Sequence, residues 1–170
     1  MLIENDTDSN GSEAGLYFKV DSQDTAARRK GAIIFQRTKS TGVGNMHFAV
    51  DDTADAGDAT SAANTRLFIS GSGNVGIGTT SPAANLHISK TSTDVGLRLT
   101  AVATSDARIA DISFFNNTDS VGAIQAWRDG ADDQMSMRFL TQGSDGNLER
   151  LRITHDAKIS GSAISTGSFG

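Results

Sequence analysis

The chain has 170 residues, with 15 lysines and arginines against 20 aspartates and glutamates, so its formal net charge is −5 at pH 7. Proteins that bind nucleic acid usually carry a basic face, and the only basic cluster here is residues 28–30, so we expect no nucleic-acid partner. The absence of cysteine excludes disulfide scaffolds and thiol catalysis, and no apolar run reaches the ~20 residues of a membrane-spanning helix, so we expect no membrane insertion.

The amino-acid usage favours strands joined by turns. There are 18 glycines, 19 serines and 17 aspartates but only 3 glutamates. Glycine, serine and aspartate stabilise turns and compete with helical hydrogen bonds. Leu, Ile, Val and Phe together number 36, which is a small supply of core residues for this length. A thin core is expected when partner chains supply the remaining burial, so the composition predicts a strand-rich, oligomeric protein.

In chain order, residues 1–14 are polar and rich in turn formers, and we expect a flexible or linking start. Short segments follow in which apolar residues alternate with others, the pattern of half-buried antiparallel strands. These segments are residues 16–20, 46–50, 67–69, 75–77, 86–88, 97–99, 112–114 and 135–139. Only residues 22–30 and 104–110 suggest helix, and both are short. The alternation also predicts that Phe68, Phe115 and the histidines point outward.

An internal repeat arranges these segments in two modules. Gly15-Leu16-Tyr17-Phe18 matches Gly96-Leu97-Arg98-Leu99, and later matches follow in the same order. The later pairs are residues 33–35 with 112–114, 44–46 with 122–124, and 66–70 with 150–154. The offset varies only in loops, where insertions cost little. We therefore expect a first β module at 15–85, a second at 86–163, and a connector at 164–170 that leads to another part of a longer protein.

One stretch is specific enough to indicate a family. It is Gly73-Asn74-Val75-Gly76-Ile77-Gly78-Thr79-Thr80-Ser81-Pro82, followed by Leu86-His87-Ile88. This stretch resembles the module junction of bacteriophage tail-fibre and side-fibre shaft proteins, and the same motif occurs in trimeric fibrous surface adhesins of bacteria. Residues 149–161 resemble a second junction, which departs from the pattern because Ala157 and Ser162 stand where the first has Gly73 and Gly78.

The resemblance implies an all-β fold: an elongated homotrimeric fibre of tandem antiparallel β modules with interwoven strand junctions. It implies a structural shaft segment of a viral tail fibre, outside the cell, that presents a distal receptor-binding element to a host cell surface. The partners would be further copies of the chain, neighbouring virion or fibre proteins, and the host receptor. Two alternatives stay open, a receptor- or glycan-binding module of a bacterial surface adhesin and a polysaccharide-degrading tailspike.

The residue pattern of the junction suits close packing between chains. Val75 and Ile77 face one side of the strand, whereas Gly76 and Gly78 leave the other side without side chains, so that another backbone can approach. Pro82 has no N–H and favours an extended residue before it, so it ends the strand and redirects the chain. We predict that these five residues form the trimer junction and that the glycine side faces neighbouring chains.

Nucleotide and calcium sites have weaker support in the sequence. Residues 71–76 satisfy GxGxxG, but residues 77–82 cannot open the helix that a dinucleotide site needs. The aspartates of loop 51–64 could bind calcium, yet Ala56 and Ala62 stand where an EF-hand requires glycine and glutamate. We therefore interpret this loop as a solvated turn.

Catalytic and histidine sites are also not expected. The three histidines, His47, His87 and His155, lack metal-ligand spacing, although three copies of one histidine could meet on a trimer axis. No GxSxG motif is present, so we expect no catalytic residue, no metal and no cofactor. Any receptor contact is expected in loops 51–64 and 128–134. The candidate surface-loop residues are Asp51, Asp52, Asp55, Asp58 and Trp127.

Overall fold

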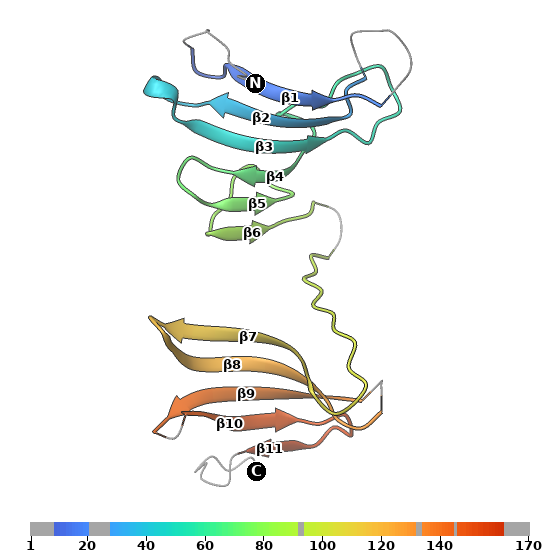
Figure 1. Ribbon diagram of the computed structural model, residues 1–170, viewed down its shortest axis with the longest axis vertical. Coiled ribbons are helices and arrows are strands. Elements are labelled where there is room, and N and C mark those ends of the chain that lie inside the picture. The colour runs from blue at the N-terminus through green and yellow to red at the C-terminus, as the bar shows by residue number, and fades with distance from the viewer. Residues whose placement is uncertain (1–8, 21–27, 92–93, 132–133, 145, 162–170) are drawn as a thin grey trace. The chain divides into compact units, whose positions relative to one another are not determined.

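The computed structural model describes residues 9–20, 28–91, 94–131, 134–144 and 146–161. The chain divides into two compact units, Met1–Gly96 and Leu97–Gly170, and each contains one β-sheet (Figure 1). A single 3-10 turn, Ser40–Gly42, is the only helical element among the described residues. Within that part of the chain, no helix is long and apolar enough to cross a membrane. The fold is all-β, as the sequence predicts.

The first sheet has six strands, which lie side by side in chain order (Figure 1). They are β1 (Glu13–Phe18), β2 (Gly31–Arg37), β3 (Gly44–Val50), β4 (Thr65–Ile69), β5 (Val75–Ile77) and β6 (Leu86–Ile88). The pairs from β1 to β5 are antiparallel, whereas β5 and β6 are parallel, which corrects the expectation of a purely antiparallel module. The GxGxxG residues 71–76 form the turn into β5 and part of that strand, so they open no helix.

The second sheet has five antiparallel strands, again in chain order. They are β7 (Arg108–Asn116), β8 (Asp119–Arg128), β9 (Met135–Gly143), β10 (Gly146–Ile153) and β11 (Ile159–Gly161). The turn between β7 and β8 has only two residues, and Asn117 occupies it with a φ of 58°. Asparagine tolerates this left-handed conformation, which explains why the long hairpin turns there.

The core of the first unit is small and lies on one face of its sheet, here called the covered face. The core residues are Ala32, Ile34, Ala49 and Ala59, with Tyr17 packed against them. Ala59 belongs to loop 51–64, and its N–H donates to the carbonyl of Arg29 at 2.8 Å. The loop therefore lies over the sheet and buries small side chains that would otherwise face water. Ala59 and Ser61 are buried while most other residues of the loop are exposed, so the loop covers the sheet with one side and faces solvent with the other.

Two residues that the sequence places outward lie inside on the covered face. Phe68 is 3% exposed and His47 is 4% exposed. The two are directly opposite each other on β4 and β3, and their rings meet edge to face with centroids 5.0 Å apart. The outward assignment of both residues is wrong, because loop 51–64 closes the face on which they lie. Phe115 is exposed, as expected.

Several element boundaries differ from the sequence expectations. The strand Leu86–Ile88 pairs with β5 and so belongs to the first unit, which ends at Gly96 and not at residue 85. Residues 104–110 form no helix, because β7 starts at Arg108. Residues 97–99 are not assigned to a strand. The expected helix at 22–30, the start of the chain and the connector at 164–170 lie wholly or largely outside the described residues.

Candidate functional site

The face of the first sheet opposite the covered face is apolar, and we call it the first apolar face. The strand register places alternate residues of all six strands on it. These residues are Leu16, Phe18, Ile33, Phe35, Met46, Phe48, Val50, Leu67, Ile69, Val75, Ile77, Leu86 and Ile88. Six of them are exposed, including Leu86 at 57% and Val50 at 53%. Contiguous apolar patches of this kind mark interaction surfaces in soluble proteins.

The second sheet has the same property on one of its faces, which we call the second apolar face. Its residues are Ala110, Ile112, Phe114, Ile124, Ala126, Met135, Met137, Phe139, Leu151, Ile153 and Ile159. Phe114 is 50% exposed, and Ile112, Met135, Ile153 and Ile159 are also exposed. The neighbour of Phe114 in the chain, Phe115, points to the opposite side of the strand. Taken by itself, each unit therefore has one apolar face that its described residues leave exposed.

The predicted junction residues form β5 and the turn that follows it. Val75 and Ile77 lie on the first apolar face, and Gly76 lies on the covered face, as the alternation predicts. A Cβ atom at Gly76 would lie 2.2 Å from the carbonyl oxygen of Thr79. Gly78 has a φ of 73°, and a Cβ there would lie 2.2 Å from the carbonyl oxygen of Ser89. The backbone that approaches both glycines thus belongs to the same chain, where a neighbouring chain was expected.

The turn after β5 is held by backbone hydrogen bonds on both sides. The N–H of Gly78 donates to the carbonyl of Arg66, and the N–H of Ser89 donates to the carbonyl of Ile77, both at 2.9 Å. The carbonyl of Pro82 accepts a bond from the Asn74 side-chain amide at 3.4 Å. Only residues 78–85 connect the parallel strands β5 and β6, which is shorter than a usual parallel crossover of about a dozen residues. The turn is therefore tight, and this explains its need for glycine.

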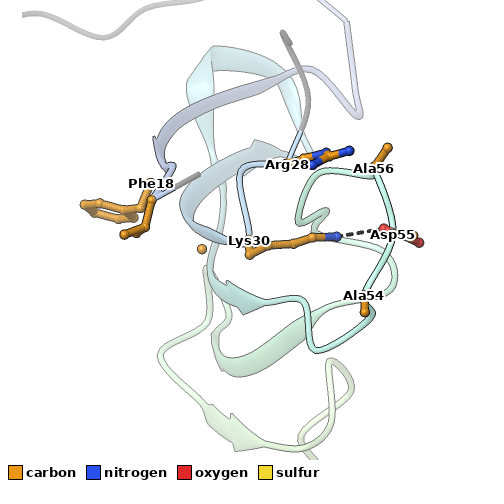
Figure 2. Close-up of a pocket in the computed structure, with 8 residues that line it drawn as sticks. Phe18, Arg28, Lys30, Ala54, Asp55 and Ala56 are labelled. Atoms are coloured by element: carbon orange, nitrogen blue, oxygen red, sulfur yellow. Dashed lines mark hydrogen bonds and ion pairs between the residues drawn. The ribbon is translucent and has the colours of Figure 1, made fainter. Parts of the chain in front are cut away.

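A hollow of about 830 Å³ lies at the start of β2 (Figure 2). Its lining is Phe18, Val20, Arg28, Lys30, Gly31, Ala54, Asp55 and Ala56. The Lys30 ammonium reaches the carboxylate of Asp55 at 2.7 Å and so is already paired (Figure 2). Phe18 and Val20 remain exposed. Because Phe18 belongs to the first apolar face, the hollow borders that face.

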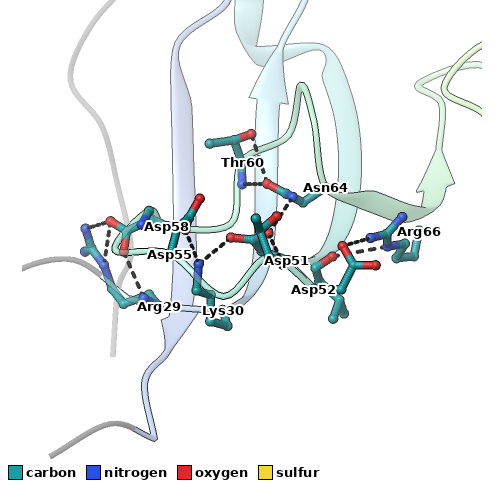
Figure 3. A network of polar contacts seen from close by, with 12 residues as sticks. Arg29, Lys30, Asp51, Asp52, Asp55, Asp58, Thr60, Asn64 and Arg66 are labelled. Carbon is teal, nitrogen blue, oxygen red and sulfur yellow. Dashed lines mark hydrogen bonds and ion pairs between the residues drawn. The ribbon is translucent and has the colours of Figure 1, made fainter.

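The four aspartates of loop 51–64 are all paired with cations (Figure 3). Lys30 bridges Asp51 at 2.6 Å and Asp55 at 2.7 Å. Arg29 bonds Asp58 through two of its nitrogens, and Arg66 reaches Asp52 at 3.0 Å.

These contacts change the electrostatics of the loop. The bond from Lys30, together with the Thr53 amide, lowers the pKa of Asp51 to about 2. The Arg29 bonds likewise lower the pKa of Asp58. Across the described residues, no three acidic or histidine side chains gather closely enough to hold a metal ion. The loop carboxylates attach the loop to the two residues before β2 and to Arg66 of β4, which is a structural role.

A polar cluster on the covered face is not apparent from the sequence. Ser61 is buried and donates a hydrogen bond to the carboxylate of Glu13, which also accepts one from Gln36 at 2.8 Å. His47 lies on the same face, but its Nδ1 is hydrogen-bonded to the hydroxyl of Thr65, at 3.0 Å, and not to that of Ser61. The Ser61 hydroxyl is therefore bonded to Glu13 and the His47 ring to Thr65, so the cluster contains no serine–histidine pair. Among the described residues, the three histidines lie on three separate parts of the chain and form no group.

Trp127 lies in β8 and not in a loop. Its indole Nε1 donates to the side-chain oxygen of Gln125 at 2.9 Å. The guanidinium of Arg138 lies over the ring, 4.1 Å from its centre. Burial lowers the pKa of Arg138, and Glu149 lies 3.6 Å from it. Because Arg138 already occupies a ring face, Trp127 is a packing residue of the second sheet. Of the other loop predicted to contact a receptor, 128–134, residues 132 and 133 lie outside the described residues.

No protein-family model matches the chain, and no curated protein matches its sequence. Among solved structures, the chain is similar to the carboxy-terminal domain of the bacteriophage T5 L-shaped tail fibre. The identity is 11% and the TM-score 0.37, over 96% of this chain and 83% of that chain. It is also similar to the same domain with its intramolecular chaperone domain, with 11% identity, a TM-score of 0.38, and coverage of 100% of this chain and 64% of that chain.

Proposed function

We propose that the chain is a shaft segment of a homotrimeric bacteriophage tail fibre, whose role is structural and not catalytic. The observation that carries the proposal is the uncovered apolar face that each of the two sheets presents. Alternating apolar residues on every strand of a sheet are expected only where something covers that sheet. Within the described residues, loop 51–64 covers only the opposite face of the first sheet.

Copies of the same chain are the simplest cover for these faces. Burying apolar surface contributes about 25 cal/mol per Å², so thirteen side chains on one face are a large driving force. A closed arrangement of identical copies, each directing its apolar face inward, would leave no copy with an exposed face. The tail-fibre-like junction at residues 73–82 supports three copies and the fibre role.

In this proposal the segment acts mechanically. It supplies length and three-fold geometry, and the threefold repetition of a distal receptor-binding element turns weak contacts with a host surface into tight binding. The segment would lie in the tail fibre of the virion, next to other fibre parts. The ion-paired loop 51–64 and the Arg138-covered Trp127 favour a structural role over sugar binding.

Two adjacent phenylalanines allow a matched test of the apolar faces. Phe114 lies on the second apolar face and Phe115 on the opposite side, and both are exposed. We expect Phe114→Lys to abolish the trimer, because a buried unpaired charge is costly, and Phe115→Lys to leave it intact. Analytical ultracentrifugation at low micromolar concentration measures the trimer fraction. Equal trimer fractions for the two variants, or a soluble folded monomer for the parent chain, would contradict the proposal.

A second experiment separates the shaft from a receptor-binding or enzymatic role. The isolated chain is applied to a glycan array and incubated with capsular polysaccharide. We expect neither glycan binding nor released oligosaccharide. Binding would support a receptor-binding module, and release would support a degrading enzyme; either result would overturn the structural role.

A further inference from the structure

Residues 94–99, here called the linking segment, join the two units and have the sequence of a strand without a partner. Val95, Leu97 and Leu99 alternate with Asp94, Gly96 and Arg98. Every residue of the segment is exposed, Leu97 at 67%. No backbone N–H or carbonyl of the segment is hydrogen-bonded to another described residue. Exposed alternating apolar residues with an unsatisfied backbone indicate a strand that pairs with something else.

The second sheet has an open edge that lacks a strand. β7 is nine residues long and pairs only with β8, so its other side is unpaired among the described residues. Ile112 and Phe114 of β7 are exposed on the second apolar face. A long, apolar, unpaired edge strand is a template for strand addition, and soluble proteins normally cover such edges.

The internal repeat relates the linking segment to this edge. In the first unit, β1 is the edge strand and pairs antiparallel with β2, with Leu16 opposite Ile33. The repeat matches Leu16 with Leu97, and Ile33 with Ile112. The linking segment is therefore the counterpart of β1, and β7 is the counterpart of β2. In the second unit the equivalent pairing is absent among the described residues of one chain.

The register transferred from the first sheet is chemically consistent. It places Leu97 opposite Ile112 and Val95 opposite Phe114, so that both apolar pairs lie on the second apolar face. It also places Arg98 opposite Asp111, on the other side of the strand. Opposite charges directly across a strand pair are stabilising, and aromatic and β-branched residues are favoured cross-strand neighbours. The register was defined only by the internal repeat, and the side chains that it places opposite each other are compatible.

We propose that the linking segment of one copy adds as an antiparallel strand to β7 of a neighbouring copy, with Leu97 opposite Ile112. Among the described residues of its own chain, the segment has no strand partner. Exchange of one strand between identical copies satisfies both the segment and the edge. The proposal rests on the proposed homotrimer and adds to it a defined strand exchange.

A disulfide cross-linking experiment tests the pairing. The chain has no native cysteine, so any disulfide must form between the introduced residues. One chain carries Leu97→Cys and a differently tagged chain carries Ile112→Cys, and the two are co-expressed and oxidised with oxidised glutathione. We expect a disulfide-linked dimer that contains both tags on a non-reducing denaturing gel. The matched control is Arg98→Cys with Ile112→Cys, in which the side chains face opposite sides; it should cross-link about tenfold less.

Three further measurements distinguish exchange between chains from pairing within one chain and from no pairing at all. In a single chain with both Leu97→Cys and Ile112→Cys, a disulfide confined to the monomer would overturn the exchange. In the unmodified assembly, hydrogen exchange of a peptide that covers residues 94–100 should be slow, and fast exchange would contradict pairing. A trimer by ultracentrifugation in which the two introduced cysteines form no disulfide between chains would overturn the strand exchange and leave the shaft proposal standing. A monomer would overturn both.

Discussion

At the scale of single residues, the glycines after β4 have a physical role within one chain. Gly78 adopts a left-handed backbone conformation, and both Gly76 and Gly78 lie against carbonyl oxygens of their own chain. The sequence predicted that the backbone of neighbouring chains approaches these positions, whereas the carbonyls beside them in the structure belong to the same chain. The parallel pairing of β5 and β6 brings Ser89 back beside Gly78. Alternation within a strand does not reveal such a pairing, so the sequence could not identify the approaching segment.

The own-chain contact gives a prediction for alanine variants. Gly78→Ala should lower the free energy of unfolding by about 1–3 kcal/mol, because it combines left-handed strain with a clash against the Ser89 carbonyl. Gly76→Ala should have a similar effect through Thr79. The control is Gly42→Ala, since Gly42 shares the left-handed backbone, with a φ of 79°, but a Cβ there meets nothing within 4 Å. Urea denaturation measures all three, and a Gly78→Ala chain as stable as the control would exclude the contact as the cause.

His47 illustrates what alternation alone cannot decide. Thr65 donates its hydroxyl hydrogen to the Ser61 carbonyl at 2.7 Å, so Nδ1 of His47 must carry a hydrogen to bond Thr65. The other nitrogen, Nε2, is buried and has no hydrogen-bond partner among the described residues. Protonation would place a charged N–H there without an acceptor. Burial accordingly lowers the pKa of His47, although Glu13 opposes this.

The lowered pKa of His47 predicts a pH dependence of stability. As the pH falls below about 6.5, the unfolded chain takes up the proton first, so the contribution of neutral His47 is complete above that pH and is lost below it. The slope should be at most about 1.4 kcal/mol per pH unit. His47→Gln should flatten the curve between about pH 7 and pH 5. Unfolding free energies at fixed protein concentration provide the comparison, and parallel curves for variant and parent would refute it.

At the scale of elements, alternation correctly located strands in both units, but it did not show which face a single chain covers. In β3, the alternation predicted that His47 points outward, on the side opposite Met46 and Phe48. The reverse holds within one chain, because loop 51–64 covers the His47 side. Loop composition hides this role, since a loop rich in aspartate and alanine resembles a solvated turn. Only its pairing with Arg29, Lys30 and Arg66 reveals it.

Strands with weak alternation could not be located as segments. β8 contains Gly122 and Ala123, which are residue types of low strand propensity, and its pairing with β7 and β9 compensates for them. The linking segment is the opposite case. Its residues 97–99 alternate clearly, but they pair with no strand among the described residues of their own chain. In both cases the deciding factor is the neighbouring strand and not the segment itself.

The ion pairs of loop 51–64 predict that metal removal has no effect. Because Lys30 and Arg29 already hold the carboxylates of Asp51, Asp55 and Asp58, a calcium ion would have to displace them. We expect the same melting temperature with millimolar EDTA and with millimolar calcium, within about 1 °C, because a ligand that binds the folded state would raise it. Differential scanning fluorimetry is sufficient. A clear rise with calcium would point to a site in this loop.

At the scale of the whole molecule, the two apolar faces decide how stability depends on concentration. If copies cover these faces, unfolding and dissociation are coupled. The melting temperature should then fall by several °C on about 100-fold dilution. Calorimetry at high concentration and fluorescence at low concentration cover the range. A melting temperature independent of concentration would indicate that each chain is stable without partners.

The strand order has a consequence for how the chain folds. In both sheets every strand lies beside its neighbours in the chain, so all pairings are short in sequence separation. Local pairings form quickly, and the hairpins need no distant segment to close. We therefore expect each sheet to fix its register during synthesis, from the N-terminus onward and before another copy is met. The turns of a nascent chain thus determine which apolar side chains lie on the faces that later contact other copies.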